Sequence, residues 1–268
     1  MKNLLLLLVL FVFNLTIVKA QDITGILGAF PPELVMLQSK MANKKDTIIA
    51  NIRFTKGILN GKSVVLAQTG IGKVNAAITT TLMIQYFKPK EIVFSGIAGG
   101  IDPGLFPGDI VIGTEVTYHD YGAIEDSGMI YLPTKNPWTM TENPVKYVSD
   151  PALVEKAISV SKGIKFSQVI RENGSFSPVV TKGIIVTGDV FVASETATQR
   201  LRKDLNAAAT EMEGAAIAQT CFQQNIPFLI IRSLSDKANK KAGEDIQSFY
   251  KIAAENAAML VMAVIGAK

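Results

Sequence analysis

The stretch that decides the fold is residues 91–100, which reads EIVFSGIAGG. Its first half is a short apolar run typical of a strand buried in a parallel sheet, and its second half is a glycine-rich turn. Helical spacing precedes it over residues 74–86, and a second strand pattern follows over residues 109–118. A strand flanked in this way by a helix and a further strand indicates an α/β unit.

The same alternation extends over the rest of the chain. Strands are predicted at residues 23–29, 183–187, 208–212 and 227–233, and helices from Glu33 and at residues 151–162, 195–205, 214–224 and 246–265. Residues 47–55 and 63–67, with the turn Asn60-Gly61 before the second run, predict an antiparallel hairpin. We therefore expect a three-layer α/β/α fold with a central mixed, mostly parallel twisted sheet, in one domain spanning residues 21–268.

The pattern becomes irregular between residues 119 and 150, a stretch that holds Trp138. A segment of about 30 residues is too long to serve only as a connection between two elements of a compact domain. We interpret it as a functional loop or lid.

The first twenty residues have the composition of an export signal. Lys2 supplies a positive charge, residues 4–13 form an unbroken apolar run, and Val18 and Ala20 suit a signal peptidase. We expect a signal peptide at residues 1–20, and a mature protein that is periplasmic or secreted and has no membrane segment. The alternative is an uncleaved anchor, although the apolar run is short for a membrane span.

Composition excludes several classes of protein. The chain of 268 residues has one cysteine and one histidine, which rules out an internal disulfide and a zinc site of the usual kind. Its formal charge of +4 falls to +2 when the two lysines of the signal are removed. So small a charge argues against a nucleic-acid partner, which needs a concentrated basic face.

In this class of fold, ligands bind beyond the carboxyl ends of the strands. Glu33 follows the first strand, where it could serve a ligand or be an ordinary acid in the first turn of a helix. The glycines of residues 96–100, Gly99 among them, allow close backbone approach to a ligand. Phe191 follows the strand at 183–187, where it could stack on a flat ring or belong to the core.

Two further strand ends carry acids. Glu211 and Glu213 lie two residues apart before a helix start, and a carboxylate there could bind the two hydroxyls of a ribose. The alternative is a helix-start acid beside a surface acid. Ser235 and Asp236 follow Arg232 at the end of the last apolar strand. An acid in that place could be protonated and deliver its proton to a leaving group.

Several motifs occur together in one order along the chain. They are Gly28-Ala29 followed by Glu33, then residues 69–76, 96–100, 107–111, 118–120, 187–189, 211–213 and 233–236. In this order they resemble those of the 5′-methylthioadenosine/S-adenosylhomocysteine nucleosidases, members of the nucleoside phosphorylase/nucleosidase superfamily. The likeness covers nearly all of the mature chain, and the longer loop after His119 is the one large difference.

The resemblance implies hydrolysis of the N-glycosidic bond of an adenosine-type nucleoside, such as methylthioadenosine or S-adenosylhomocysteine, to adenine and a pentose. The reaction runs through an oxocarbenium-like sugar. Three residues would be catalytic. Asp236 would protonate N7 of the purine, Glu33 would orient and deprotonate the attacking water, and Glu213 would hold the ribose hydroxyls.

The resemblance also implies the binding residues, which are Phe191, Val192, Met212, Ser235, Ile97 and Gly99. Phe191 would stack on the adenine, the backbone of Val192 would read its edge, Met212 would pack against the sugar, and Ser235 would orient Asp236. The partner would be a small-molecule purine nucleoside, the protein a homodimer, and the reaction one that requires no metal or organic cofactor.

One alternative is a purine nucleoside phosphorylase. The phosphorylases of this superfamily bind phosphate through arginines after the first strand and before the glycine-rich turn, whereas those places here hold residues 30–32 and Phe94. Glu33 would also repel phosphate. Water is therefore the favoured nucleophile.

Another alternative is a nucleoside-binding or storage protein without catalysis. The nucleosidases usually carry a small hydroxyl residue within the glycine-rich turn, and this chain has Ile97 there, although Ser95 could supply a hydroxyl nearby. His119 precedes Asp120, but no nucleophile motif accompanies the pair, so we interpret this single histidine as a structural or interface residue.

Overall fold

The computed structural model describes residues 22–171 and 174–267, so the predicted signal peptide at residues 1–20 lies outside the described residues. The strands are β1 (Ile23–Gly28), β2 (Ala42–Ile49), β3 (Ile52–Leu59), β4 (Lys62–Gln68), β5 (Glu91–Gly100), β6 (Ile110–Tyr118), β7 (Gly122–Glu125), β8 (Gly128–Tyr131), β9 (Lys146–Val148), β10 (Val169–Arg171), β11 (Gly174–Phe176), β12 (Val180–Thr187), β13 (Ala207–Glu211) and β14 (Phe228–Asp236). The helices are α1 (Pro31–Lys40), α2 (Lys73–Phe87), α3 (Pro151–Ser161), α4 (Glu195–Leu205), α5 (Gly214–Gln223) and α6 (Ala242–Gly266).

The main sheet is mixed, as predicted. Its strands follow the order β13-β12-β6-β14-β5-β1-β4-β3-β2, with β9 paired to β6. Strands β1, β4, β5 and β14 run parallel to one another, whereas β6, β12 and β13 form a second parallel group that runs opposite to them. Strand β13 also pairs with the end of β5 in antiparallel fashion, so this part of the sheet curls back on itself.

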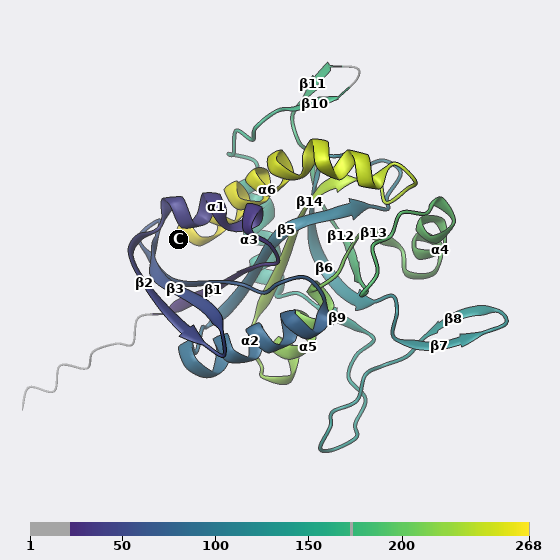
Figure 1. Ribbon diagram of the computed structural model, residues 1–268, viewed down its shortest axis with the longest axis horizontal. Coiled ribbons are helices and arrows are strands. Elements are labelled where there is room, and N and C mark those ends of the chain that lie inside the picture. Colours follow the sequence, from purple (N-terminus) through teal and green to yellow (C-terminus); the bar gives the residue numbers. More distant parts are fainter. Residues whose placement is uncertain (1–21, 172–173, 268) are drawn as a thin grey trace, which may run out of the picture.

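Helices cover both faces of the sheet, which gives the expected three layers (Figure 1). Helices α2 and α5 pack side by side on one face, and α1, α3 and α6 pack together on the other. Each face has its own buried apolar cluster. Over the part of the chain that the structure describes, α6 is the one helix long and apolar enough to cross a membrane, and 50% of its most apolar window is buried inside the protein.

The structure corrects several predicted boundaries. Residues 96–100, which were predicted to form a glycine-rich turn, are the second half of strand β5. Residues 47–55 are not one strand, because Ala50 and Asn51 form a turn with φ angles of 49° and 63° that separates β2 from β3. The last predicted strand, 227–233, extends through Asp236 as β14. The irregular stretch 119–150 contains the β7–β8 hairpin and β9.

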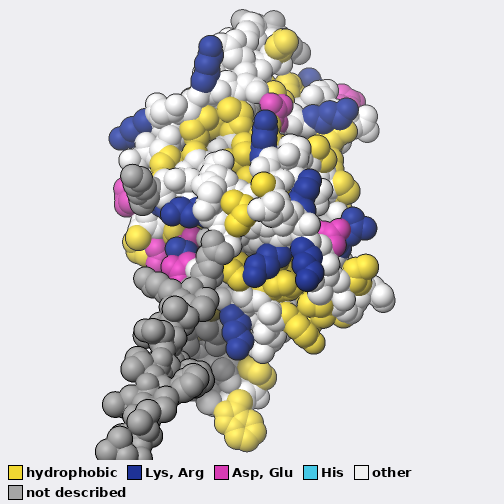
Figure 2. All heavy atoms as spheres, turned by 90° about the vertical axis from the view of Figure 1, so that its left-hand side faces the viewer, with side chains coloured by type: hydrophobic (Ala, Val, Ile, Leu, Met, Phe, Trp, Pro, Cys, Tyr) yellow, Lys and Arg dark blue, Asp and Glu magenta, His cyan; other side chains and the backbone are white. Residues whose placement is uncertain are grey.

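The outer strand β2 is almost entirely exposed and carries Lys44 and Lys45. Lysines on an edge strand discourage pairing with another chain. Figure 2 shows the face of the molecule that contains this edge, where Lys and Arg side chains are spread among apolar and polar groups.

Candidate active site

A cavity of about 230 Å³ opens at the carboxyl end of β5 and β14. Its lining residues are Ala29, Phe30, Glu33, Ile71, Ile97, Ala98, Gly99, Phe191, Thr210, Glu211, Met212, Glu213, Ser235, Asp236 and Ile246. The three predicted catalytic acids therefore converge on one cavity, although Glu33 lies 180 residues before Glu213 and 203 before Asp236 along the chain. Among the nine predicted site residues, only Val192 does not line it.

Glu33 is held by the backbone at the start of α1. Two prolines open this helix, and Glu33, its third residue, reaches back to accept hydrogen bonds from the N–H groups of Ala29 and Phe30. A third N–H, that of Ile97, donates to Oε1 at 2.9 Å. Burial raises the pKa of Glu33, while the nearby Arg232 guanidinium and the three N–H groups lower it. Glu33 is thus both an acid in the first turn of a helix and a residue that lines the cavity.

Asp236 is the last residue of β14, and a β-bulge opposite Gly99 sets its direction. The Ser235 hydroxyl donates to Oδ2 at 2.8 Å, and the Ala238 N–H donates to Oδ1 at 2.7 Å. Burial raises the pKa of Asp236, which favours the protonated form. A Cβ at position 99 would lie 2.9 Å from Oδ1, so the close approach requires a glycine there.

Glu213 caps the start of α5. Its Oε1 accepts a hydrogen bond of 2.9 Å from the Gly72 N–H, and its Oε2 lies 3.6 Å from Nη2 of Arg232. Burial and the neighbouring Glu211 raise the pKa of Glu213 to about 8, against the attraction of Arg232.

Glu211 lines the same cavity as Glu213, but its carboxylate is held by groups of the protein. Its carboxylate accepts hydrogen bonds from the Thr187 hydroxyl, from the Gly214 N–H at 2.8 and 2.9 Å, and from Arg232 at 2.6 Å. Every one of these donors belongs to the protein. Glu211 therefore stabilises the site, and Glu213 is the acid that remains available to a ligand.

Arg232 lies beside the acids of the site, although the sequence analysis named it without giving it a role. It is fully buried, its guanidinium lies 3.6 Å from the centre of the Phe94 ring, and it pairs with Glu211 and Glu213. Among the described residues, its Nε and Nη1 find no hydrogen-bond partner. A charged residue inside the apolar run 228–234 was the available signal, because such a charge is buried only when it is paired.

The predicted binding residues divide into two groups. Phe191 is 54% exposed and lines the cavity, so the alternative that it belongs to the core is wrong. The side chain of Val192 packs into a small apolar cluster with Leu201 and Leu205 of α4, and the predicted contact of its backbone with the base stays a prediction. Ile97 contributes a backbone N–H to Glu33, and that contact does not depend on its side chain.

His119 is buried, and its ring packs against Gly188, where a Cβ would overlap it. Burial lowers the pKa of His119. Within residues 22–171 and 174–267, no group of three or more His, Cys, Asp or Glu side chains is placed to hold a metal ion.

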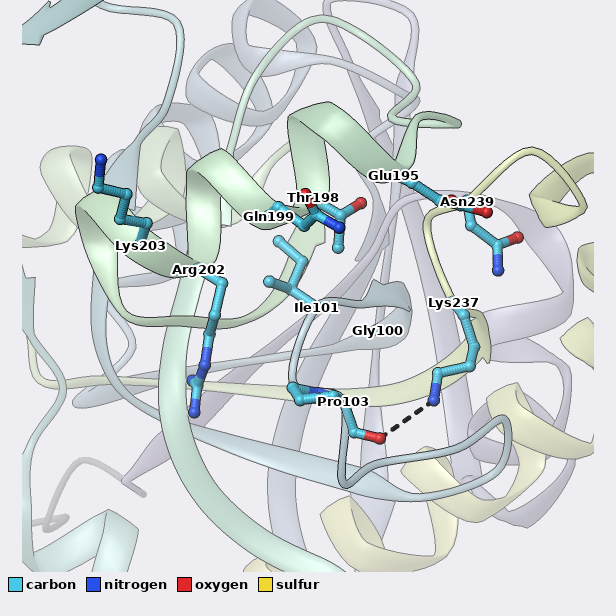
Figure 3. A pocket seen from close by; sticks show the side chains of 10 residues that line it. All are labelled: Gly100, Ile101, Pro103, Glu195, Thr198, Gln199, Arg202, Lys203, Lys237 and Asn239. Atoms are coloured by element: carbon cyan, nitrogen blue, oxygen red, sulfur yellow. Dashed lines mark hydrogen bonds between the residues drawn. The ribbon is translucent and has the colours of Figure 1, made fainter.

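A second cavity, of about 460 Å³, lies between α4 and the residues that follow β14 (Figure 3). Arg202 from α4 pairs with Asp102 at 2.9 Å, and Lys237 donates to the Pro103 carbonyl at 3.2 Å. These cations already have partners in the protein. None of the predicted catalytic acids lines this cavity.

Comparison with known proteins agrees with this geometry. A family model described as the phosphorylase superfamily matches residues 23–266. The 5′-methylthioadenosine/S-adenosylhomocysteine nucleosidase of Psychromonas ingrahamii is 40% identical over 90% of this chain and 97% of its own, and that of Staphylococcus aureus is 38% identical over 90% and 98%. The chain therefore belongs to the phosphorylase superfamily and, within it, to the 5′-methylthioadenosine/S-adenosylhomocysteine nucleosidases.

Solved structures are similar over the same length. The Neisseria meningitidis nucleosidase in complex with methylthio-immucillin-A has a TM-score of 0.79 and 35% identity, and covers 91% of this chain and 99% of its own. The Colwellia psychrerythraea nucleosidase in complex with adenine has a TM-score of 0.78 and 36% identity, with 92% and 95% covered. Futalosine hydrolase of Helicobacter pylori has a TM-score of 0.75 and 26% identity, with 91% and 97% covered.

Proposed function

We propose that this protein hydrolyses the N-glycosidic bond of adenosine-type nucleosides, among them 5′-methylthioadenosine and S-adenosylhomocysteine, to adenine and a pentose. The observation that carries the proposal is the convergence of Glu33, Glu213 and Asp236, all buried and all with a raised pKa, on one cavity. The names of the related proteins, two of which were solved with adenine or a nucleoside analogue, support it.

Asp236 supplies the proton that the leaving base needs. Its raised pKa keeps the carboxyl group protonated closer to neutral pH than an exposed aspartate, and general acids work best with a pKa near the operating pH. Ser235 and the Ala238 N–H fix the direction of the carboxyl group. Transfer of the proton to N7 lets the purine leave as a neutral base.

Glu33 orients the water that attacks the anomeric carbon and takes up its proton. Three backbone N–H groups hold the carboxylate rigidly, and its raised pKa makes it a stronger base than an exposed glutamate. The hydroxide adds to the sugar, one proton passes to Glu33, and the proton from Asp236 departs with the base. The sum is the addition of one water across the glycosidic bond.

Glu213 grips the ribose hydroxyls. Because its pKa is raised, the group takes up a proton closer to neutral pH than an exposed glutamate does, and in that form it can donate as well as accept a hydrogen bond. Positive charge that develops on the sugar favours the ionised form, because an opposite charge nearby stabilises a carboxylate. This group therefore binds the transition state more strongly than the substrate.

Two alternatives are less well supported. A phosphorylase must hold a phosphate dianion, and here Glu33 occupies the cavity while Arg232 is bound to Glu211 and stacked on Phe94. A storage protein without catalysis was suggested by Ile97. An isoleucine in place of a small hydroxyl residue at position 97 leaves the hydrogen bond from the backbone N–H of that residue to Glu33 intact.

The test is a base-release assay on a panel of nucleosides, with and without added phosphate. We expect the wild-type protein to release adenine without phosphate, Asp236→Asn to be slower by about 100-fold or more, and the exposed-site control Asp204→Asn to be unchanged. Strict dependence on phosphate would establish a phosphorylase. Nucleoside binding without base release over hours would establish a storage protein.

We also propose that the protein is a homodimer. Val74 and Ile78 on α2 and Phe222 on α5 are 69%, 47% and 45% exposed, on two helices that pack side by side. Exposed apolar groups of this kind are typical of an interface. Light scattering should give twice the mass of the mature chain for the wild-type protein and for the control Ile48→Glu on β2. For Val74→Glu it should give the mass of one mature chain.

Export remains a proposal that rests on the sequence of residues 1–20. We propose cleavage after Ala20, which leaves residues 21–268 as one domain in the periplasm or medium. N-terminal sequencing of protein recovered from those fractions should begin at Gln21. A chain that begins at Met1 and sediments with membranes would instead indicate an anchor.

A further inference from the structure

Three segments that do not carry the proposed catalytic acids meet at Lys73. Lys73 begins α2, Asp120 follows β6, and Asp189 follows β12. The Lys73 ammonium donates to both carboxylate oxygens of Asp120 at 2.8 Å and lies 3.7 Å from Oδ2 of Asp189. The three residues come from sequence motifs that the proposed function leaves without a role.

Backbone contacts close these three side chains into a ring. The N–H of Lys73 donates to Oδ1 of Asp189 at 2.8 Å, and the N–H of Asp189 donates to Oδ2 of Asp120 at 2.8 Å. Glycines make this close packing possible. A Cβ on Gly188 would lie 3.0 Å from Cγ of Asp120, and Gly72 has a φ of 96° that favours glycine.

Two of the three side chains are partly shielded from solvent, whereas that of Asp189 is 46% exposed. The side chains of Lys73 and Asp120 are 22% and 23% exposed, and the ammonium lies 5.5 Å from the centre of the Tyr118 ring. By contrast, the pair formed by Lys182 and Glu155 has the same 2.8 Å distance, but its side chains are 46% and 66% exposed. Ion pairs on the open surface contribute little, whereas partly buried pairs contribute more.

The ring adjoins the site at the neighbouring peptide group. Gly72, the residue before Lys73, donates its N–H to Oε1 of Glu213 at 2.9 Å. Since Asp120 and Asp189 hold Lys73 on the other side of the Gly72 Cα, they restrict how far the peptide group between Ile71 and Gly72 can move.

We propose that Lys73, Asp120 and Asp189 are positioning residues that hold the Gly72 N–H against Glu213. The ring thereby orients Glu213 for binding of the sugar and does not itself contact the substrate. The inference rests on the proposed function, which assigns Glu213 to the ribose. It predicts a loss specific to the sugar, because adenine alone makes no contact with Glu213 in the proposed arrangement.

The experiment compares Lys73→Met with the conservative Lys73→Arg and with the matched control Lys182→Met. For Lys73→Met we expect kcat/KM for methylthioadenosine to fall by about tenfold or more, the loss that follows when a charged hydrogen-bond partner is removed. The inhibition constant of adenine should change by less than about threefold. Lys73→Arg should recover most of the activity, and Lys182→Met should match the wild-type protein.

Hydrogen exchange measured by mass spectrometry gives a readout that needs no turnover. Amides in residues 69–73 should exchange about tenfold faster in Lys73→Met than in the wild-type protein and in Lys182→Met, because the hydrogen bond to Glu213 opens more often. Unchanged exchange there, or equal losses for adenine and for the nucleoside, would overturn the inference. A wild-type protein that releases no adenine from any nucleoside would overturn the proposed function instead, and the exchange comparison would still decide whether the ring holds Gly72.

Discussion

Replacing Arg232 with methionine tests whether one buried cation holds the acids of the site together. The guanidinium is fully buried, lies 2.6 Å from Glu211 and 3.6 Å from Glu213, and stacks on Phe94. Methionine has a similar length and keeps much of the apolar contact, so the change removes mainly the charge and its hydrogen bonds.

The expected loss of stability is about 3 to 5 kcal/mol, the usual cost of leaving a buried charge without its partner. In a domain of this size each kcal/mol corresponds to about 2 to 4 °C. The midpoint of thermal unfolding should therefore fall by roughly 6 to 20 °C at pH 8. The fall should be smaller at pH 5, because Arg232 lowers the pKa of both Glu33 and Glu213, and its charge stabilises these acids less as they take up protons.

The assay is thermal unfolding followed by circular dichroism, with Glu211→Gln as the second arm of a double-mutant cycle. If the buried carboxylate causes the loss, the double variant Arg232→Met/Glu211→Gln should be more stable than Arg232→Met alone. A loss below about 1 kcal/mol, or losses that simply add in the double variant, would refute the reasoning.

Gly96→Ala should abolish most activity and lower the unfolding midpoint, because a Cβ there would overlap Nη1 of Arg232 and Oε1 of Glu33. Phe191→Ala should raise KM by about tenfold with kcat changed by less than about threefold, since base stacking contributes about 1 to 3 kcal/mol. Glu213→Gln should flatten the pH dependence of the urea midpoint. Its folded pKa of about 8 lies above the ordinary value, so the stability that this group contributes at low pH is lost as pH rises toward 8.

Each of these variants has a control. Gly243→Ala adds a Cβ in open space and should leave activity unchanged. Val190→Ala removes a half-exposed side chain beside Phe191 and should leave KM unchanged. Glu155→Gln alters an exposed glutamate and should retain the wild-type pH dependence. Equal effects in a variant and its control would contradict the corresponding prediction.

The sequence predicted the layers of the fold because long elements carry their own signal. The helices 151–162 and 195–205 differ from the observed α3 and α4 by at most one residue. The turn at Ala50 and Asn51 was missed because neither glycine nor proline marks it and the apolar alternation continues through it. The opposite direction of β13 relative to β5 is a tertiary feature that no local pattern encodes.

The site was predicted in part. Glu33, Glu213 and Asp236 lie at or shortly after the carboxyl ends of strands, so their positions, together with the family resemblance, indicated them as candidates. The burial of Arg232 against Glu211 depends on a contact between a side chain of β14 and a side chain of β13. The two residues are 21 apart in sequence. Side-chain pairing of this kind follows from the packed structure and not from spacing along the chain.

The proposed catalytic acids and the other residues that line the cavity are held in different ways, and this determines which of them can be substituted. Asp236 is the last residue of β14 and Glu33 is held by three backbone N–H groups, so the main chain fixes both of these proposed catalytic acids. Ile71 and Phe191 stand in loops and Ile246 on α6. A redesign that alters only these three side chains could therefore move the range of accepted nucleosides while the distance between the two acids stays the same.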